Sequence, residues 1–247
     1  MFFHVASLHK YISTCFLIPA ASLVVSLPAW ADFSSVFTAP PYALDQTIIG
    51  IEDWEMVNKE PYPVYTDPMM AVLVESPFFN SSQPTTLSLK TLIKNMLLRP
   101  EELGDHFVME TQFAVSFTPN YDRWGGLYFR LGANPASSPF VFGYDHDKEG
   151  DGGFYFQGAE GRVVFLQRAE IQENSLYKFV VRVDMGGGTF SIQVTNADNP
   201  SFHYEKKDIA FQEEYVPKPY NTSGLFMGNN KPSFMEAFIN SIKVTSE

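Results

Sequence analysis

Apolar and polar residues alternate along much of the chain after residue 105. In residues 107–117, 176–185 and 189–195, one set of alternate positions is mainly aromatic or aliphatic and the other is mainly polar. This period of two is typical of antiparallel strands with one buried side and one side facing solvent. Three consecutive glycines, Gly186 to Gly188, separate the last two segments and readily accept the positive φ of a tight turn. We therefore predict a hairpin over 176–195.

Shorter apolar segments predict further strands. Turn-forming Gly, Pro, Asn and Asp residues separate them, and many short strands at such spacing indicate a sandwich or jelly roll. Residues 32–84 are rich in proline and have a weaker pattern, in which Met69–Glu75 is the clearest strand candidate. The later candidates are Gly126–Leu131, Pro139–Tyr144, Gly153–Gln157, Arg162–Arg168, Gly224–Gly228 and Glu236–Val244.

One segment has the spacing of a helix instead. Between Ser88, a candidate N-cap, and Pro100, a stop signal, apolar residues recur every three or four positions. The competing interpretation is a strand over Thr85–Leu89 that leads into a loop. We therefore predict an all-β fold, an antiparallel two-sheet β-sandwich of jelly-roll type with one short helix. The apolar residues of the predicted helix are Leu89, Leu92, Ile93, Met96 and Leu97.

The first 31 residues have the features of a secretory signal peptide. They contain no acidic residue, and an apolar run over about 12–27 is followed by Ala29-Trp30-Ala31. The run is shorter than the ~20 residues that span a bilayer, so we expect cleavage after Ala31 and no transmembrane segment in the mature chain. Residues 32–247 then form a single domain, secreted to the periplasm or the cell exterior.

Composition narrows the choice of partners. The only cysteine, Cys15, lies within the predicted signal, so the mature chain forms no disulfide and depends on its core, for which 23 Phe residues are available. Loss of Lys10 with the signal lowers the formal net charge from −11 to −12. An acidic chain is a poor partner for nucleic acid or an anionic membrane, and it is compatible with cations or neutral polymers.

The order of these segments resembles the concanavalin A-like lectin/glucanase superfamily, including the laminin-G-like jelly-roll domains of exported bacterial proteins. The resemblance also includes Gly50–Trp54 near the start, whereas Asn240-Ser241 departs from the more usual Asp-Asn near the end. It implies the sandwich fold. It leaves function open, because the superfamily contains lectins, adhesion modules, glycanases, lyases and spacers. The segments that carry it are Gly125–Arg130, Phe140–Tyr144, Gly153–Phe156, Leu176–Asp184, Thr189–Val194 and Ala237–Val244.

An acidic run between two predicted strands has two interpretations. Asp145, Asp147, Glu149 and Asp151 place carboxylates at every second position beside glycines, and Ca²⁺ takes six to eight oxygen ligands. The alternative is an exposed hairpin loop, where Asp and Gly suit the turn. The run lacks the bidentate Glu that an EF-hand requires twelve positions along. If Ca²⁺ binds, we expect it to order the loop without taking part in chemistry.

Aromatic and basic residues near the strand ends are the candidate ligand contacts. Flat rings stack on apolar ligand faces, and sugar rings present such faces. Trp124 enters a strand from a polar loop, Tyr128 and Arg130 share a strand face, and Tyr144 ends the next strand. The competing interpretation is that these aromatic residues fill the core or its edge.

The sequence favours binding over catalysis. The paired-carboxylate string Glu-x-Asp-x-x-Glu of sandwich glycanases and the Gln-Ile-His strand of sandwich lyases are both absent. We therefore expect a secreted non-catalytic module that binds carbohydrate or another surface polymer. The alternatives are a polysaccharide lyase or glycoside hydrolase around Tyr128, Arg130, His106 and the Asp145 loop, and an envelope spacer protein.

Overall fold

The computed structural model describes most of the second half of the chain and shorter parts of the first half. The described residues are 33–37, 39–42, 50–52, 54–56, 64–65, 72–75, 92–95, 104–117, 125–131, 138–146, 152–212, 225–228 and 235–247.

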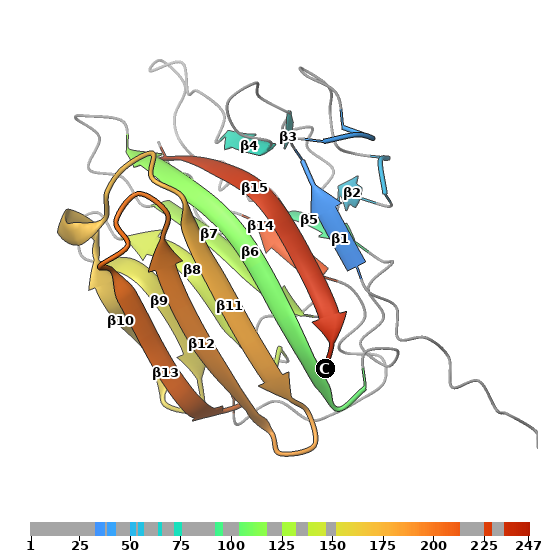
Figure 1. Cartoon of the computed structure of the whole chain (residues 1–247), viewed down its shortest axis with the longest axis vertical. Helices are drawn as coiled ribbons and strands as arrows, with labels where there is room; N and C mark the ends of the chain where they lie inside the picture. The colour runs from blue at the N-terminus through green and yellow to red at the C-terminus, as the bar shows by residue number, and fades with distance from the viewer. Residues whose placement is uncertain are drawn as a thin grey trace, which may run out of the picture.

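Eight antiparallel strands form the first sheet, which is the front layer of Figure 1. Seven follow the order β13-β12-β11-β6-β15-β4-β3. On the side of β15 away from β6, β4 pairs with its first half and β1 with its second half. The strands are β1 (Phe33–Val36), β3 (Val64–Tyr65), β4 (Val72–Glu75), β6 (His106–Phe117), β11 (Tyr177–Asp184), β12 (Thr189–Asn196), β13 (His203–Ala210) and β15 (Met235–Ser246).

Seven antiparallel strands form the second sheet, which lies behind the first (Figure 1). Their order is β10-β9-β8-β7-β14-β5-β2. The edge strands β10 and β13 lie on the same side of the sandwich, where the backbone N–H of Ala159 donates to the carbonyl of Ala210 at 2.9 Å. The strands are β2 (Trp54–Met56), β5 (Leu92–Asn95), β7 (Gly125–Leu131), β8 (Val141–His146), β9 (Gly152–Gly158), β10 (Gly161–Gln167) and β14 (Leu225–Gly228).

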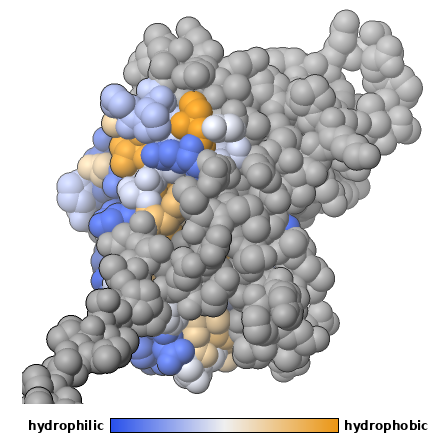
Figure 2. Space-filling model, turned by 90° about the vertical axis from the view of Figure 1, so that its right-hand side faces the viewer, coloured by the Kyte–Doolittle hydropathy of each residue, from blue (hydrophilic) through white to orange (hydrophobic). Residues whose placement is uncertain are grey.

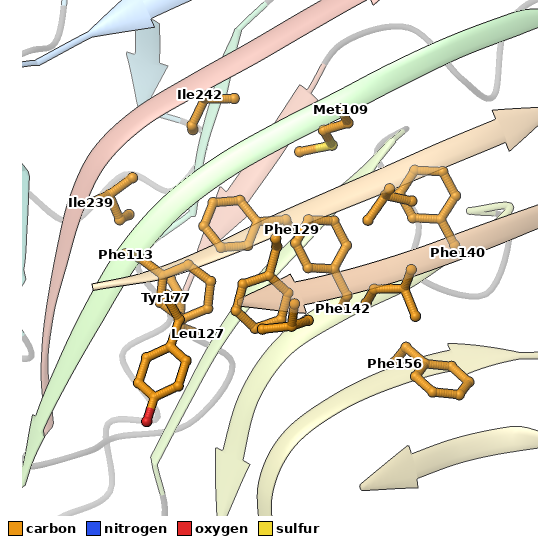
Figure 3. Packing of buried hydrophobic residues seen from close by; sticks show 14 of the residues in the cluster. Met109, Phe113, Leu127, Phe129, Phe140, Phe142, Phe156, Tyr177, Ile239 and Ile242 are labelled. Carbon is orange, nitrogen blue, oxygen red and sulfur yellow. The ribbon is translucent and has the colours of Figure 1, made fainter. Parts of the chain in front are cut away.

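Aromatic rings fill the space between the sheets. Phe113 stacks on Phe179 within the first sheet, with ring centroids 4.7 Å apart, and Phe129 stacks on Phe142 within the second, at 5.3 Å. Phe142 and Phe179 join the two pairs across the interface at 5.6 Å. Figure 3 shows Phe113, Phe129 and Phe142 among aliphatic side chains from both layers. Offset stacks of this kind add to the stabilisation from buried apolar area.

A buried polar network joins the sheets at the other side of the core. The Glu52 carboxylate accepts hydrogen bonds from the hydroxyls of Tyr42 at 2.6 Å and Ser35 at 2.8 Å. The indole N–H of Trp54 lies 3.2 Å from the Ser35 hydroxyl oxygen and 3.1 Å from that of Tyr42. Because Ser35 is on β1 and Trp54 on β2, these bonds link one sheet to the other.

The structure confirms the predicted sandwich and most of its strands. The three long alternating segments are β6, β11 and β12, and the glycine turn ends at Gly188 with φ +67°. The six later candidates correspond to β7 to β10, β14 and β15, with small shifts at their ends. Of Met69–Glu75, the last four residues form β4.

Two predictions need correction. The segment predicted as a helix contains β5 instead, because Leu92–Asn95 pairs with β14 on one side and β2 on the other. The rest of that segment lies outside the described residues. The sequence analysis also missed β13, an edge strand whose side chains are mostly exposed and charged, so it has no apolar alternation.

The described surface contains few large apolar side chains. Figure 2 views the molecule from the right-hand side of Figure 1, and the coloured part of this surface mixes hydrophilic with hydrophobic residues. Among the large hydrophobic side chains whose exposure the structure describes, only Val36 is exposed, at 41 %. No helix in this part of the chain is long and apolar enough to cross a membrane.

Candidate functional site

The side of the second sheet that faces away from the core has polar and aromatic side chains. On β7, Leu127 and Phe129 enter the core, so Tyr128 and Arg130 point to the opposite side. A separate small cluster of Tyr128, Val141 and Tyr155, with Val164 packed against it, lies on that side. We call this side the β7–β10 face; its described residues are Tyr128, Arg130, Val141, Gly143, Asp145, Tyr155, Gln157, Arg162 and Val164.

Two cross-strand rows organise the β7–β10 face. In the first row, Gly143 lies between Tyr128 and Tyr155. Gly143 has φ +153°, and a Cβ atom at this position would lie 2.0 Å from the backbone oxygen of Leu127. The close approach of β7 and β8 therefore requires glycine, and Gly143 contributes no side chain between the two tyrosines.

The second row has an arginine at each end. Arg130 on β7 is opposite Val141, Val141 is opposite Gln157, and Gln157 is opposite Arg162 on β10. With strands about 4.8 Å apart, the Cα atoms of the two arginines are separated by about 14 Å. The face therefore presents a line of side chains four strands wide.

Each guanidinium lies over a tyrosine ring. The Cζ atom of Arg130 is 5.1 Å from the ring centroid of Tyr128, and that of Arg162 is 4.7 Å from the ring centroid of Tyr155. Both distances are within the range of cation–π attraction. Because the attraction uses the flat face of the guanidinium, the N–H groups in its plane keep their ability to donate hydrogen bonds.

Arg162 also binds Asp145 across β9. Its Nη1 atom lies 3.1 Å from Oδ2 of Asp145, and Nη2 donates to the Asp145 backbone oxygen at 3.4 Å. The side chain of Arg162 is 37 % exposed and that of Asp145 only 7 %. Arg130, at the other end of the row, is 3 % exposed. Along the row that contains both arginines, exposure therefore falls from the β10 edge towards β7.

An amide chain borders the face near Gln157. The Gln157 side-chain amide donates to the Gln212 side-chain oxygen at 2.8 Å, and the Gln212 amide donates to the backbone oxygen of Ser138 at 2.9 Å. The backbone N–H of Gln212 also donates to the carbonyl of Pro139 at 3.2 Å. These bonds fix the orientation of Gln157 within the row that joins the two arginines.

Burial shifts the pKa values of three groups on this face. Desolvation raises the pKa values of Tyr128 and Tyr155 above the usual tyrosine value, so both rings keep their hydroxyl protons at neutral pH. Desolvation lowers the pKa of Arg130, but a guanidinium starts so high that it stays charged. The face therefore combines neutral phenols with two cations and one carboxylate.

The structure brings together some of the predicted ligand contacts. Tyr128 and Arg130 share the β7–β10 face, as their common strand face predicts. Tyr144 does not join them: it is fully buried in the main core, with its ring edge-on to that of Phe154 at 6.0 Å, so it has no ring face for a ligand. Trp124 lies outside the described residues.

The sequence analysis missed Tyr155 and Arg162 as members of this site. Tyr155 stands between two core residues, Phe154 and Phe156, and this alternation is the signal that places its ring on the opposite side. The signal for Arg162 is weaker. Val163 packs against the core, which places Arg162 on the opposite side, but Val164 on that side is apolar, and the ion pair with Asp145 depends on strand order.

The acidic run remains a prediction as a calcium site. Asp145 lies in β8, where its carboxylate pairs with Arg162. Asp147, Glu149 and Asp151 lie outside the described residues. Within the described part of the chain, no three His, Cys, Asp or Glu side chains are grouped to hold a metal ion.

His106 does not converge with Tyr128 and Arg130. It begins β6 in the other sheet, where its Nδ1 atom is 3.8 Å from the Asp184 carboxylate and its side chain is 59 % exposed. The residues named for a lyase or hydrolase therefore do not meet at one place.

Comparison with solved structures identifies the fold. No family model matches the chain, and no curated protein sequence matches it. The seed lectin of Lotus tetragonolobus shares 13 % identity with a TM-score of 0.53, covering 87 % of this chain and 97 % of the lectin. Lectin I from Ulex europaeus, in complex with the methyl glycoside of α-L-fucose, shares 10 % with a TM-score of 0.51, covering 87 % and 98 %.

A third similar structure is a carbohydrate esterase from a Shiga toxin-encoding bacteriophage. It shares 9 % identity with a TM-score of 0.51, covering 87 % of this chain and 97 % of the esterase. Identities this low establish the fold alone. The chain has the jelly-roll β-sandwich fold of concanavalin A-like proteins.

Proposed function

We propose that the protein is an exported, non-catalytic module that binds carbohydrate or another surface polymer through the β7–β10 face. The observation that carries the proposal is the pairing of two arginines with two tyrosine rings on one sheet face. Guanidinium and amide groups donate hydrogen bonds to sugar oxygens, and aromatic rings pack against the C–H faces of sugars once the ring faces become accessible. Two proteins of similar structure are a lectin complexed with a fucoside and a carbohydrate esterase.

The chemistry of the face favours binding over catalysis. Glycoside hydrolysis generally needs two carboxyl groups across the scissile bond, and Asp145 is the one carboxylate among the described side chains of this face, where it is bound by Arg162. Proton abstraction needs a group with a pKa near the working pH, and burial moves Tyr128 and Tyr155 in the opposite direction. These groups are suited to hold a polymer.

The exposure of the side chains on the β7–β10 face determines which of them a polymer reaches first. Tyr128 and Tyr155 are 8 % and 4 % exposed, whereas the side chain of Arg162 at the β10 edge is 37 % exposed. A polymer therefore meets Arg162 first, and contact with the two rings requires the face to become more accessible than it is in this structure. Hydrogen–deuterium exchange measures both events.

The test combines retention by polysaccharides with hydrogen–deuterium exchange. The purified protein is passed through gels that contain neutral or acidic polysaccharides, and exchange is then followed with the polymer that retains it. We expect slower exchange in peptides from β7, β9 and β10, and no change in the β11–β12 hairpin. Protection confined to that hairpin would place binding on the other sheet. Retention by no polysaccharide would reject the proposal and favour the spacer alternative.

A further inference from the structure

Two glutamine side chains at the border of the β7–β10 face form hydrogen bonds whose direction is fixed by chemistry. The backbone oxygen of Ser138 can only accept a hydrogen bond, so the atom of Gln212 that lies 2.9 Å from it is the side-chain nitrogen. The other end of the Gln212 amide is therefore its oxygen, which accepts from the side-chain nitrogen of Gln157 at 2.8 Å. The carbonyl of Ser138 thus determines the orientation of both amides.

Gln212 is held in this orientation by burial and by its backbone. Gln212 is 8 % exposed and Ser138 is fully buried. The backbone N–H of Gln212 donates to the carbonyl of Pro139 at 3.2 Å, and that of Phe211 donates to the carbonyl of Gly188 at 2.9 Å. Turning the Gln212 amide over would bring two oxygens together inside the protein and remove a buried hydrogen bond, which is costly.

Gln157 is less buried than Gln212, and its side-chain oxygen is able to accept a further hydrogen bond. Gln157 is half-buried on β9, where it lies opposite Arg162. Because its nitrogen faces Gln212, the oxygen is the end of the amide that faces away from Gln212. Among the residues that the structure describes, none donates a hydrogen bond to this oxygen, and the guanidinium of Arg162 is directed to Asp145 instead. An amide oxygen binds donors such as hydroxyl groups and repels other oxygens.

We propose that Gln157 is a specificity-determining residue of the β7–β10 face, whose side-chain oxygen accepts a hydrogen bond from an unsubstituted hydroxyl group of the bound polysaccharide. Gln212 is the positioning residue that keeps this oxygen, and not the amide nitrogen, directed to the ligand. This inference rests on the proposed function. It adds that the preferred sugar unit has a free hydroxyl at this position, and that a unit substituted there by a methyl, acetyl or sulfate group is bound less tightly.

Ligand pairs that differ in hydrogen-bond donors test the preference. Dextran, xylan, galactan and polygalacturonate are each compared with an O-methylated derivative, which keeps the sugar oxygens and loses hydroxyl protons. For a polymer that retains the protein, we expect the native form to bind about ten-fold more tightly than its O-methylated form. Methyl groups also add bulk, so the comparison of this affinity ratio between variants decides the cause.

Two variants remove the proposed contact in different ways. Gln157→Leu removes the acceptor. Gln212→Leu leaves the Gln157 amide able to rotate and to offer its N–H groups to a methylated oxygen. In both we expect the ratio to fall from about ten-fold towards one, whereas a preference that arises from bulk would persist. A partial loss of folded protein lowers binding of both polymer forms equally, so it does not change the ratio.

Two further variants serve as the rescue and the control. Gln212→Glu keeps an acceptor facing Gln157 and loses the donor facing Ser138, so we expect lower stability with an unchanged ratio. Gln193→Leu is the matched control, because Gln193 is a half-buried glutamine in the middle of β12 on the other sheet. It is expected to keep both the affinity and the ratio of the parent protein.

The outcomes separate this inference from the proposed function. Equal binding of native and methylated polymers by the parent, or an unchanged ratio in Gln157→Leu, overturns the inference and leaves the proposed function standing. An unchanged ratio in Gln212→Leu overturns the positioning role, and an equal fall in Gln193→Leu shows that the effect is not specific to this face. A fall in both leucine variants of the amide pair, with the ratio kept in Gln212→Glu and Gln193→Leu, supports it. Retention of the protein by none of the polymers rejects both proposals.

Discussion

Replacing Gly143 by alanine tests how closely β7 and β8 must approach beneath the two tyrosines. The added Cβ would lie 2.0 Å from the Leu127 backbone oxygen and 2.9 Å from its carbonyl carbon, whereas ordinary contacts begin at 3.4 Å. The atom that is too close belongs to the backbone, so relief requires the two strands to separate. This separation weakens their hydrogen-bond ladder at the centre of the β7–β10 face.

The magnitude follows from two contributions. A positive φ costs a residue with a side chain about 1–2 kcal/mol, and forcing an extra carbon into a packed site costs about 1–3 kcal/mol. We therefore expect Gly143→Ala to lower the free energy of unfolding by about 2–5 kcal/mol, a large part of the 5–15 kcal/mol typical of a domain. Gly161→Ala is the control, because Gly161 has φ +84° but nothing within 4 Å of its added Cβ. Its expected loss is about 1–2 kcal/mol.

Urea unfolding followed by circular dichroism measures both variants against the parent protein. Similar slopes with different midpoints would show that the substitutions change stability without changing the surface exposed on unfolding. The reasoning fails if Gly143→Ala is no more destabilising than Gly161→Ala, since the close approach to Leu127 would then cost nothing.

Three further predictions follow from groups described above. Glu52→Gln replaces a charged acceptor in the network between the sheets, and we expect its urea midpoint to fall by the equivalent of about 1–3 kcal/mol; an unchanged midpoint would refute the role of the network. Burial raises the pKa values of Tyr42, Tyr144 and Tyr155 in the folded protein. We therefore expect these groups to leave stability unchanged below pH about 10, the pKa of tyrosine in the unfolded chain, and to lower stability above that pH. Tyrosinate absorbance should then rise as the circular dichroism signal of the sheets disappears. Rising absorbance without unfolding would contradict this. If the acidic run binds calcium, adding Ca²⁺ raises the melting temperature of the parent protein and not of Asp147→Asn, whereas an unchanged parent rejects the site.

The strands were predictable where one side of a strand is buried and the other faces solvent. This holds for β6, β11 and β12, whose apolar residues occupy alternate positions over eight or more residues. It does not hold for β5, because Leu92 and Ile93 belong to a set of apolar residues with helical spacing. They form a strand because they pair with β14 on one side and β2 on the other. Nor does it hold for β13, an exposed edge strand. Pairing between distant segments outweighs local pattern in both cases.

The candidate site was predictable only in part for a related reason. The alternation of β7 places Tyr128 and Arg130 on the same face, and the alternation of β8 places Tyr144 with Phe140 and Phe142 in the core. Both assignments follow from counting positions along a single strand. The partnership of Arg162 with Asp145 spans three strands, so it depends on the order of strands in the sheet, which local periodicity does not contain.

The central place of β15 determines when the sandwich is able to form. This strand contains residues 235–246 of a 247-residue chain, yet it lies between β6 and the pair β1 and β4, so the eight-stranded sheet is incomplete until it arrives. Because β15 is the last of the described strands along the chain, its pairing with β1, in which Phe33 lies opposite Val244, is possible only after the other described strands have been synthesised. Contacts between segments this distant in sequence close a long loop, so we expect completion of this sheet to be a slow step of folding.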